Sequence, residues 1–436
     1  MATGVSKHER MGLDAVSAFE SAGPFIPLPS DSAEVSISYS GKTPESEILR
    51  PVDTSFVELS SGTSKLVDEI AYNSFVWGDN LLTLSFLYQT NVKARLIYLD
   101  PPYGTGMDFH SRELDHAYSD DLGPAAYMEF MRRRLILCRE CLADDGSIYV
   151  HIGHQHVATI KLLLDEIFGA SNFRSLIARR KCSSKNFTRK QYSNLNDYVL
   201  FYSKNKTYVW NQPGTKPDQD WIEKEYPKID GLGRRFKLVP VHAPGTRNGE
   251  TGKEWRGKLP PKGKHWQYAP SKLDELDAAG DIHWSRNGNP RRKVYLTPDK
   301  RIAMTDYWAN YRDAHHQSIK ITGYPTEKNL AMLKMIVGAS SNEGDLVIDP
   351  FCGSGTTMDA ARELRRTFIG IDASSVAARA TIGRMRNGLA PMGDFVGKPK
   401  KKAPPTLFEQ PTDLKIYAES KAAELHEDEL KQILDV

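Results

Sequence analysis

Strand-like and helical patterns alternate along this chain of 436 residues, in two blocks separated by a long stretch without such periodicity. The first block predicts a strand over 75–79, a helix that begins at residue 80, and further strands and helices over 95–100, 127–142, 147–152, 157–168, 173–180 and 198–203. The second predicts them over 330–337, 345–351, 356–365, 367–372 and 374–387. Such alternation is typical of an α/β fold with a doubly wound, mostly parallel sheet, here interrupted by an insertion.

Changes of pattern along the chain predict five segments. Residues 1–50 are rich in Ser, Gly and Pro and lack an apolar period, which is typical of a flexible leader. The two α/β blocks are expected over 51–203 and 321–397, the insertion over 204–320, and a linker with an acidic C-terminal helix over 398–436.

The net charge of +3 conceals an uneven distribution. Residues 174–320 contain 30 Lys and Arg against 15 Asp and Glu, a net of +15, and the rest of the chain contains 28 against 40, a net of −12. Six of the seven tryptophans fall in the same stretch. Cations interleaved with aromatic rings are what a nucleic-acid surface requires. The alternative is a solvated basic domain whose tryptophans form its core.

Cysteine content and apolar runs exclude several classes of protein. Four cysteines are too few for a disulfide framework. Cys138 and Cys141 have zinc-like spacing but no second pair, and they lie in a helical pattern, so we expect buried thiols and no metal. No run approaches the ~18 apolar residues of a membrane span, and the polar N-terminus lacks a signal-peptide core, which predicts a cytoplasmic protein.

A four-residue motif follows the strand expected over 95–100. Asp100, Pro101, Pro102 and Tyr103 lie where a parallel strand ends, which is the edge of the sheet where ligands bind. The carboxylate and a carbonyl directed by a proline ring can accept hydrogen bonds, and Tyr103 offers a flat face. This combination suits a planar group with an NH2, such as the exocyclic amine of adenine. The alternative is a strand that simply ends at prolines beside a solvated Asp.

The sequence from Asp349 to Thr357 predicts a second strand, loop and helix junction. Its glycines, Gly353 and Gly355, permit close approach of the backbone to a ligand, and a helix N-terminus presents free N–H groups. The loop is neither a Walker loop nor the full Gly-x-Gly-x-x-Gly of nicotinamide enzymes. Asp372 ends the next strand, where a carboxylate can bind ribose hydroxyls or, alternatively, cap the following helix.

Together these motifs resemble those of the DNA amino-methyltransferases that use S-adenosylmethionine. The tetrad is similar to the catalytic motif of that family, and the F-x-G-x-G loop is similar to its cofactor motif. Trp77-Gly78-Asp79-Asn80 resembles the segment whose Asp lies near the adenine of the cofactor. Residues 323–328, with Thr326 and Lys328, resemble the segment that contacts the methionine end.

The order of the motifs, catalytic first and cofactor last, is similar to that of the β group, and within it to type III modification subunits and related stand-alone enzymes. Three positions depart from the family pattern. Tyr324 stands where His is usual, Asn329 where Pro is usual, and Gly104 where Asn often follows the tetrad.

The resemblance implies a Rossmann-like methyltransferase sheet with a circularly permuted motif order and an inserted target-recognition domain. The implied catalytic residues are those of the tetrad. The implied cofactor-binding residues are Asp79, Thr326, Lys328, Asp349, Phe351, Gly353, Ser354, Gly355, Thr356 and Asp372. The candidate DNA contacts are Arg180, Lys181, Lys185, Arg234, Arg235, Arg256, Arg291, Arg292 and Lys293.

The implied reaction is transfer of a methyl group from S-adenosylmethionine to the N6 amine of an adenine flipped out of duplex DNA. N4-cytosine methylation is the nearest alternative, although Asp at the first tetrad position resembles the adenine enzymes. Methylation of RNA or of a protein glutamine is a further alternative, although its enzymes typically have Asn there. A non-catalytic DNA-binding specificity subunit is an alternative of a different class. A homodimer and a restriction subunit stay open as partners.

Overall fold

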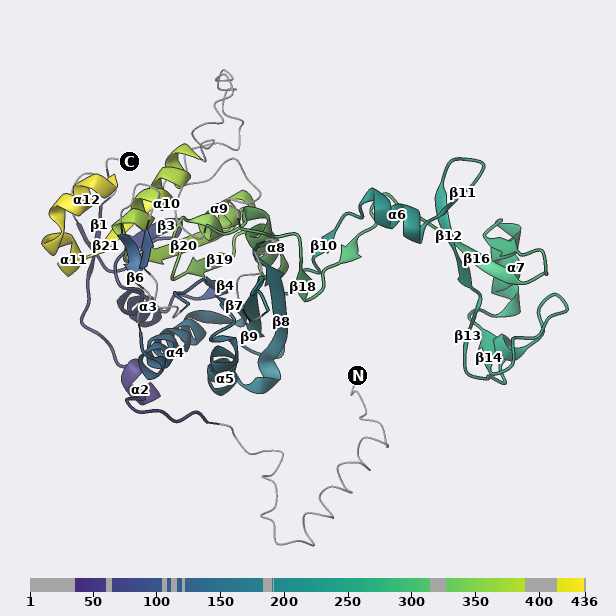
Figure 1. Cartoon of the computed structure of the whole chain (residues 1–436), viewed down its shortest axis with the longest axis horizontal. Helices are drawn as coiled ribbons and strands as arrows, with labels where there is room; N and C mark the ends of the chain where they lie inside the picture. Colours follow the sequence, from purple (N-terminus) through teal and green to yellow (C-terminus); the bar gives the residue numbers. More distant parts are fainter. Residues whose placement is uncertain are drawn as a thin grey trace, which may run out of the picture. The chain divides into compact units, whose positions relative to one another are not determined.

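The computed structural model describes residues 36–59, 65–103, 108–110, 116–119, 122–182, 190, 192–313, 327–388 and 414–434 (Figure 1). Among the candidate site residues, Lys185 and Thr326 lie outside this part of the chain, as do 1–35 of the expected leader and 398–413 of the expected linker. The chain forms two compact units, an inserted unit of residues 212–304 and a main unit made of the residues before and after it.

The main unit is built on an eleven-stranded mixed sheet, with strand order β18-β8-β9-β7-β4-β19-β20-β3-β21-β1-β2. Neighbouring strands from β7 to β21 are parallel, and antiparallel pairs join β7 to β9, β9 to β8, β21 to β1 and β1 to β2. The strands are β1 Phe56–Glu58, β2 Lys65–Val67, β3 Ser74–Trp77, β4 Ala94–Leu99, β7 Leu142–Ile152, β8 Phe173–Arg180, β9 Asn196–Ser203, β18 Tyr307–Trp308, β19 Leu346–Asp349, β20 Thr367–Asp372 and β21 Lys415–Glu419. The expected α/β fold with a mostly parallel sheet is confirmed.

Helices cover both faces of this sheet (Figure 1). On one face lie α3 Asn80–Gln89, α4 Pro124–Cys141 and α5 Val157–Phe168. On the other lie α8 Leu330–Ser340, α9 Thr356–Glu363 and α10 Ser375–Asn387. Apolar residues at helical spacing in α4 and α5 pack on alternate residues of the central strands, which is why these segments fold as the periodicity predicts.

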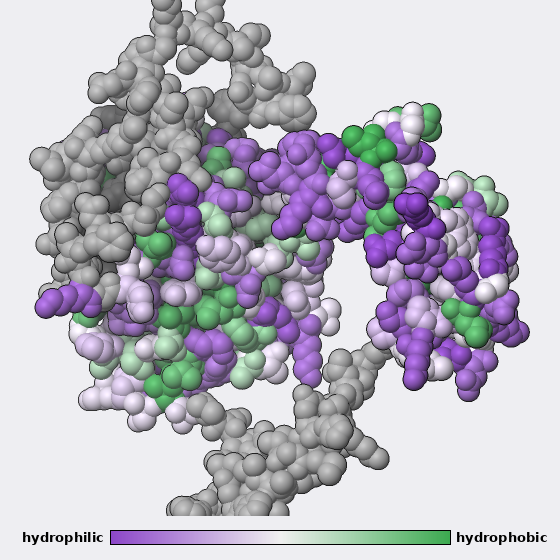
Figure 2. Space-filling view, turned by 45° about the vertical axis from the view of Figure 1, so that its right-hand side comes forward, coloured by the Kyte–Doolittle hydropathy of each residue, from purple (hydrophilic) through white to green (hydrophobic). Residues whose placement is uncertain are grey.

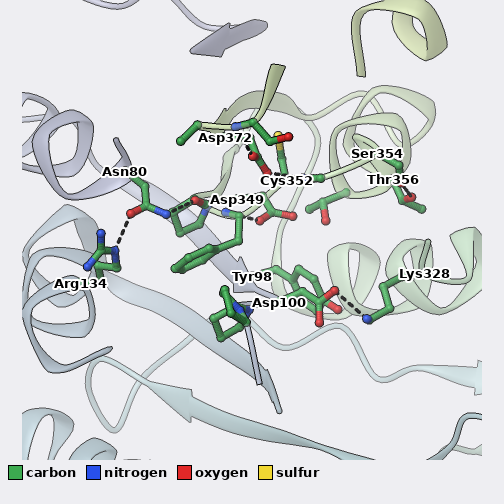
Figure 3. Close-up of a pocket in the computed structure, with 18 of the residues that line it drawn as sticks. Asn80, Tyr98, Asp100, Arg134, Lys328, Asp349, Cys352, Ser354, Thr356 and Asp372 are labelled. Carbon is green, nitrogen blue, oxygen red and sulfur yellow. Dashed lines mark hydrogen bonds and ion pairs between the residues drawn. The ribbon is translucent and has the colours of Figure 1, made fainter. Parts of the chain in front are cut away.

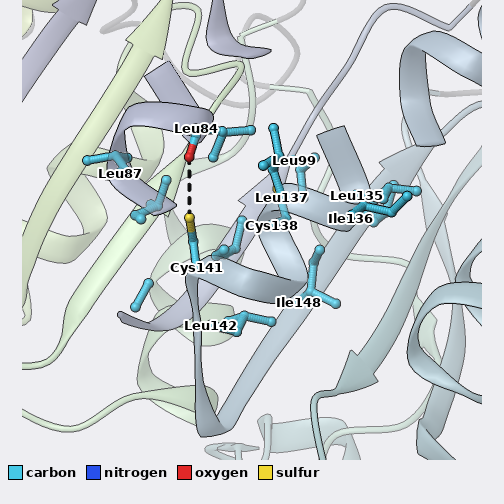
Figure 4. Packing of buried hydrophobic residues seen from close by; sticks show 14 of the residues in the cluster. Leu84, Leu87, Leu99, Leu135, Ile136, Leu137, Cys138, Cys141, Leu142 and Ile148 are labelled. Carbon is cyan, nitrogen blue, oxygen red and sulfur yellow. Dashed lines mark hydrogen bonds between the residues drawn. The ribbon is translucent and has the colours of Figure 1, made fainter. Parts of the chain in front are cut away.

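Figure 4 shows the core between α3, α4 and the sheet, where both expected thiols are buried. Cys141 Sγ lies 3.6 Å from the carbonyl oxygen of Leu84, and burial raises the pKa of the Cys141 thiol to about 12. The prediction of buried thiols is confirmed. Within the described ranges, no group of His, Cys, Asp and Glu side chains could hold a metal ion, and no helix is long and apolar enough to cross a bilayer.

Both chain ends contribute more to the main unit than the sequence predicts. From residue 36 onward the expected leader packs on the body: helix α2 (Glu45–Ile48) contacts α4, and Lys42 pairs with Glu166 at 2.7 Å. At the other end, β21 joins the sheet beside β3, and α11 (Ser420–Leu425) and α12 (Glu427–Leu434) follow it. A five-residue strand that pairs with residues more than 300 positions away carries no local signal, which is why it was not predicted.

The inserted unit has its own small core and a largely hydrophilic surface (Figure 2). Its four-stranded sheet has the order β11-β12-β16-β15. Its elements are β10 Gly214–Thr215, α6 Gln219–Glu225, β11 Lys228–Ile229, β12 Arg235–Pro240, β13 His242–Pro244, β14 Lys264–Trp266, α7 Pro270–Ala278, β15 Ile282–Trp284, β16 Pro290–Tyr295 and β17 Ile302–Ala303.

The tryptophans mostly build cores rather than a stacking surface. Trp255 and Trp266 are 2% exposed and pack with Leu273 and Ile282, and Trp284 stacks on Trp255. Trp308 is buried in the main unit. The interpretation as stacking partners of bases was therefore wrong for Trp255, Trp266 and Trp308, because indole rings are large enough to fill the core of a small unit, whereas Trp210 is 41% exposed.

The basic charge of residues 174–320 is divided between the two units. Residues 212–304 hold 19 Lys and Arg against 12 Asp and Glu, a net of +7, so the other +8 of the +15 belongs to the main unit. The inserted unit is also shorter than the expected 204–320, because Trp210 stacks on Phe201 and β18 pairs with β8.

Candidate functional site

A pocket of about 380 Å³ opens at the carboxyl ends of β4, β19 and β20 (Figure 3). Although β4 and β19 are far apart in sequence, they are adjacent in the sheet, with Ile97 opposite Ile348. From β4 the chain continues to β7, and from β19 it continues to β20 on the other side, so the pocket lies at the topological switch point of the sheet. Neighbouring loops diverge at such a point and leave a crevice for a ligand.

The pocket brings the two predicted motifs together. Of the predicted residues, its lining includes Asp79, Asp100, Pro101, Pro102, Tyr103, Lys328, Asp349, Phe351, Gly353, Ser354, Thr356 and Asp372. Gly355 is not part of the lining but ends the loop: its φ of 72° is left-handed, and a Cβ there would lie 3.0 Å from Thr381. Sequence reasoning did not single out Asn80, Tyr98, Phe130, Arg134, Glu327 or Leu333, which also line the pocket.

One hydrogen bond within the tetrad and two contacts from outside hold it in place. The Tyr103 hydroxyl donates to Asp100 Oδ1 at 3.0 Å, and Lys328 Nζ lies 2.7 Å from Asp100 Oδ2. The Tyr127 hydroxyl donates to the Pro102 carbonyl at 2.8 Å. Each carboxylate oxygen has two acceptor directions, so Asp100 retains capacity for a ligand donor.

Asp372 organises the glycine loop. Its Oδ2 accepts from the Gly353 N–H at 2.9 Å, and its Oδ1 accepts from the Ser374 N–H at 2.9 Å. The N-cap of α10 is Ser374, whose hydroxyl accepts from the Ala377 N–H, so Asp372 is not the helix cap that was the alternative interpretation. Thr381 Oγ1 donates to the Gly353 carbonyl at 2.7 Å and fixes the other side of the loop.

Arg134 shapes the wall of the pocket beside Asp79. It donates to Asn80 Oδ1 at 2.5 Å, lies 3.4 Å from Asp79 Oδ2 and covers the ring of Phe130 at 3.6 Å. Asn80 in turn donates to the Pro350 carbonyl at 2.6 Å, which joins α3 to the segment that leads into the glycine loop. Arg134 lies in an amphipathic helix, where a cation usually faces solvent, so only the packing of α3 against α4 reveals its place.

The pocket carries a negative formal charge. Asp79, Asp100, Asp349, Asp372 and Glu327 face it against Arg134 and Lys328, five carboxylates to two cations and a formal charge of −3. Burial raises the pKa of Asp349 to about 7 and the pKa of Asp372 to about 6. A site of this kind favours a ligand with cationic groups and disfavours a polyphosphate.

The raised pKa of Asp349 predicts an unusual pH dependence of stability. In the unfolded chain this carboxyl ionises near its ordinary 3.8, so between about pH 4 and 7 the folded protein holds the extra proton and loses stability as pH rises. Asp349→Asn should remove a fall in Tm of about 5 °C between pH 5 and 7. Thermal denaturation across that range checks this, with Asp144→Asn on the surface as the control. Parallel curves for Asp349→Asn and the unaltered protein would contradict it.

The candidate DNA contacts divide between the units. Arg180 and Lys181 belong to the main unit, and the other six described candidates belong to the inserted unit. Three of those six pair with carboxylates of the same unit: Arg234 with Asp230 at 2.8 Å, Arg235 with Glu223 at 3.7 Å, and Arg256 with Asp274 at 3.0 Å.

Strand β16 turns its basic residues to opposite faces of the small sheet. Arg292 pairs in register with the core residue Ile282, so it shares the covered face, where it lies 5.6 Å from the ring of Tyr268. Arg291 and Lys293 therefore lie on the other face, and Arg291 is exposed. Of these three consecutive cations, Arg291 and Lys293 thus lie on one face of the small sheet and Arg292 lies on the other.

Comparisons with known proteins agree with this geometry. The DNA methylase family profile matches residues 94–382. The chain is 58% identical over 415 residues to the type II methyltransferase M.EcaI of Enterobacter cloacae, covering 93% of this chain and 92% of that protein. It is 28% identical over 342 residues to the StyLTI Mod subunit of Salmonella typhimurium, a type III restriction-modification enzyme, covering 69% of this chain and 52% of that subunit.

Among solved structures, the M1.HpyAVI–SAM complex aligns with 71% of this chain at 17% identity and a TM-score of 0.36, and the alignment covers 98% of that chain. The family assignment rests on the sequence matches, which span both the tetrad and the glycine loop. The resemblance on which the site was predicted is thereby confirmed. With both motifs meeting in one pocket of a doubly wound sheet, the chain belongs to the DNA methylase family.

Proposed function

We propose that this methyltransferase transfers a methyl group from S-adenosylmethionine to the N6 amine of an adenine in double-stranded DNA. The observation that carries the proposal is the meeting of the tetrad and the glycine loop in the pocket at the switch point. An acceptor for an amine and a cradle for a nucleoside thus lie within one cavity.

The pocket fits S-adenosylmethionine in its chemistry. The Phe351 and Phe130 rings lie 6.0 Å apart and offer flat apolar walls, and the glycine loop lets the backbone approach closely. Asp372 and Asp79 would hold the nucleoside hydroxyls and the adenine, and Asp349 and Lys328 the ammonium and carboxylate of the methionine end. The formal charge of −3 favours a donor with a sulfonium and an ammonium group. When bound, this cofactor supplies an electrophilic methyl group on a sulfonium.

The tetrad residues act on the target amine. The amine is a weak nucleophile because its lone pair is delocalised into the ring. Asp100 and the Pro101 carbonyl accept the amine hydrogens, which favours a pyramidal nitrogen whose lone pair is free to attack. Tyr103 supplies the flat face against the base. As the nitrogen–methyl bond formed, the sulfur–methyl bond of the donor would break with its electron pair left on sulfur. Asp100 would stabilise the positive charge that the nitrogen carries until it loses one amine proton.

The target base has to leave the helix to reach this pocket, and the inserted unit is the proposed surface for target recognition. The base itself is the finer part of the proposal, since the family includes N6-adenine and N4-cytosine enzymes. Asp at the first tetrad position favours adenine. Sequencing that detects modified bases in DNA from cells expressing the chain tests this. N6-methyladenine at a fixed sequence is the expected result, and N4-methylcytosine would overturn the choice of base.

Arg291 and Lys293 of β16 supply a direct test of DNA binding. Replacing both Arg291 and Lys293 with alanine should weaken DNA binding and reduce the salt slope of log K by about 2, because each phosphate contact releases about one counterion. Binding titrations over a salt series measure this slope. The matched control is Lys253→Ala with Lys272→Ala, which removes the same charge from the same unit where Glu250 and Glu275 pair with it. If both double variants lose the same DNA affinity and salt slope, the loss comes from the change in net charge and not from contacts of Arg291 and Lys293 with DNA.

A further inference from the structure

Arg134 lies in the wall of the pocket, on the side away from Lys328 (Figure 3). Its side chain is 7% exposed, and burial lowers the pKa of the guanidinium to about 10, so the group keeps its charge at neutral pH. Burying a cation costs folding free energy unless its partners compensate for the lost hydration. The contacts of this guanidinium therefore indicate what it does in the pocket.

The guanidinium is anchored at each of its three nitrogens. Nε donates to Asn80 Oδ1 at 2.5 Å, Nη1 donates to the Phe130 carbonyl at 3.1 Å, and Nη2 lies 3.4 Å from Asp79 Oδ2. Among the described residues, these contacts use three of the five N–H groups of a guanidinium. The terminal nitrogens thus keep capacity for an acceptor on a ligand.

Asp79 keeps an acceptor beside this donor. Its Oδ1 accepts from the N–H groups of Leu81 and Leu82 at the start of α3, at 2.6 and 3.3 Å. The 3.4 Å between Oδ2 and Arg134 Nη2 is long for an N–H···O bond, so the two side chains do not form a tight ion pair. Because both line the pocket, an acceptor and a charged donor lie next to each other in its wall.

The order of the strands bears on which part of the cofactor meets this wall. Strands β4, β19, β20 and β3 are neighbours and parallel, so the carboxylates at their ends follow one another along one edge, in the order Asp100, Asp349, Asp372 and Asp79. In the proposed function the target amine meets Asp100, so the reacting methyl group lies near β4. The nucleoside then extends towards β20 and β3, which brings the adenine to Asp79 and Arg134.

Adenine has an edge that matches this pair of side chains. Its exocyclic amine donates, and the ring nitrogens on either side of the amine, N1 and N7, accept. In proteins an amide side chain often binds such an edge, because it has one acceptor and one donor side by side. Asp79 Oδ2 and Arg134 Nη2 supply the same pattern, and the charge of the donor strengthens its hydrogen bond.

We propose that Arg134 is a specificity-determining residue for the cofactor: its guanidinium donates to a ring nitrogen beside the adenine amine, while Asp79 accepts from that amine. This inference rests on the placement of the cofactor in the proposed function. Asn80 and the Phe130 carbonyl hold the guanidinium in the orientation that this contact needs.

The test compares the affinities of S-adenosylhomocysteine and its 1-deaza and 7-deaza analogues, measured by calorimetry. In each analogue a C–H replaces one of the two candidate nitrogens. On the unaltered protein, one analogue should bind about thirtyfold more weakly than S-adenosylhomocysteine, because a hydrogen bond from a charged donor is lost. On Arg134→Met, S-adenosylhomocysteine should itself bind about thirtyfold more weakly, and its preference over that analogue should fall below about threefold.

Arg134→Lys repeats the test with the buried charge retained. A lysine can still pair with Asp79, but it lacks the fork that reaches the adenine ring, so the preference should again fall below about threefold. This variant decides the matter if Arg134→Met does not fold. A merely structural role for Arg134 predicts equal losses for all three ligands, with the preference unchanged. That result, or equal binding of all three ligands by the unaltered protein, would overturn the inference.

Two controls accompany these variants. The 3-deaza analogue changes the nitrogen on the far side of the ring from the amine, so its affinity relative to S-adenosylhomocysteine should be the same in the unaltered protein and in Arg134→Met. Arg133→Met changes the preceding residue of α4, which pairs with Glu129 at 2.7 Å and is not part of the pocket lining, and it should change no affinity.

The unaltered protein separates the two levels of failure. If it methylates no DNA, the proposed function fails. If it methylates DNA but the preference for S-adenosylhomocysteine survives in Arg134→Met and Arg134→Lys, only the role of Arg134 fails.

Discussion

Replacing Asp100 with alanine should lower the rate of methyl transfer by about a thousandfold and leave the affinity for S-adenosylmethionine within about tenfold. In the proposed mechanism this carboxylate is the acceptor for the target amine, and it is also the negative charge nearest to the nitrogen as that atom becomes cationic. Lys328 pairs with Asp100 at 2.7 Å and would lose this partner. Loss of the carboxylate would also make the pocket less negative, and for these two reasons the affinity for S-adenosylmethionine is expected to change by up to about tenfold. Single-turnover kinetics and calorimetry measure the two quantities.

Asp100→Asn tests how much of this loss of rate comes from the charge of the carboxylate. It keeps the size of the side chain and one carbonyl acceptor but loses the charge, so its rate should lie between those of the unaltered protein and Asp100→Ala. Asp144→Ala, at a side chain that is 93% exposed, is the control for loss of an aspartate. Full activity in Asp100→Ala would show that the tetrad is not the catalytic site.

The second large effect is expected at Asp372. Asp372→Ala removes the carboxylate that accepts from the Gly353 and Ser374 N–H groups, so the glycine loop loses the contact that holds its shape. S-adenosylmethionine should bind about a hundredfold more weakly, since two hydrogen bonds to a charged acceptor are lost together with the acceptor itself. Calorimetric titration of the unaltered and variant proteins measures the change in Kd.

Asp345→Ala is a matched control for that variant. Asp345 also accepts a backbone N–H, from Asn342 at 2.8 Å, but it lies just before β19, at the end of the strand away from the pocket. This control should bind the cofactor with unchanged affinity. If the Kd of Asp372→Ala for S-adenosylmethionine lies within threefold of that of the unaltered protein, Asp372 does not contribute to cofactor binding.

Elements with a strong local pattern were predicted residue for residue. The apolar period over 157–168 predicted α5, and the β-rich run over 367–372 predicted β20, with the bounds that the structure has. Both depend on which side chains recur within a few positions, and that information lies within the segment itself. The two motifs were also found as local patterns, because a strand, a rigid or glycine-rich turn and a helix follow one another directly.

Features that depend on distant contacts were not predicted. Strand β21 has five residues and is recognised only by its pairing with β3 and β1. The tryptophans of the insertion could stack on bases or form a core, and composition alone does not distinguish these uses. Arg134 reads as an ordinary polar residue until the packing of α3 against α4 brings it to the pocket.

The sequence by itself therefore determined the alternating α/β fold, the tetrad and the glycine loop, because each is a pattern of neighbours along the chain. Only the tertiary structure decided that β4 and β19, some 250 residues apart, lie side by side and bring both motifs to one pocket. It also decided that the Tyr98 hydroxyl lies 2.7 Å from His151 Nδ1. The physical reason is that sheet order and buried pairing depend on contacts between distant segments, which no local pattern encodes.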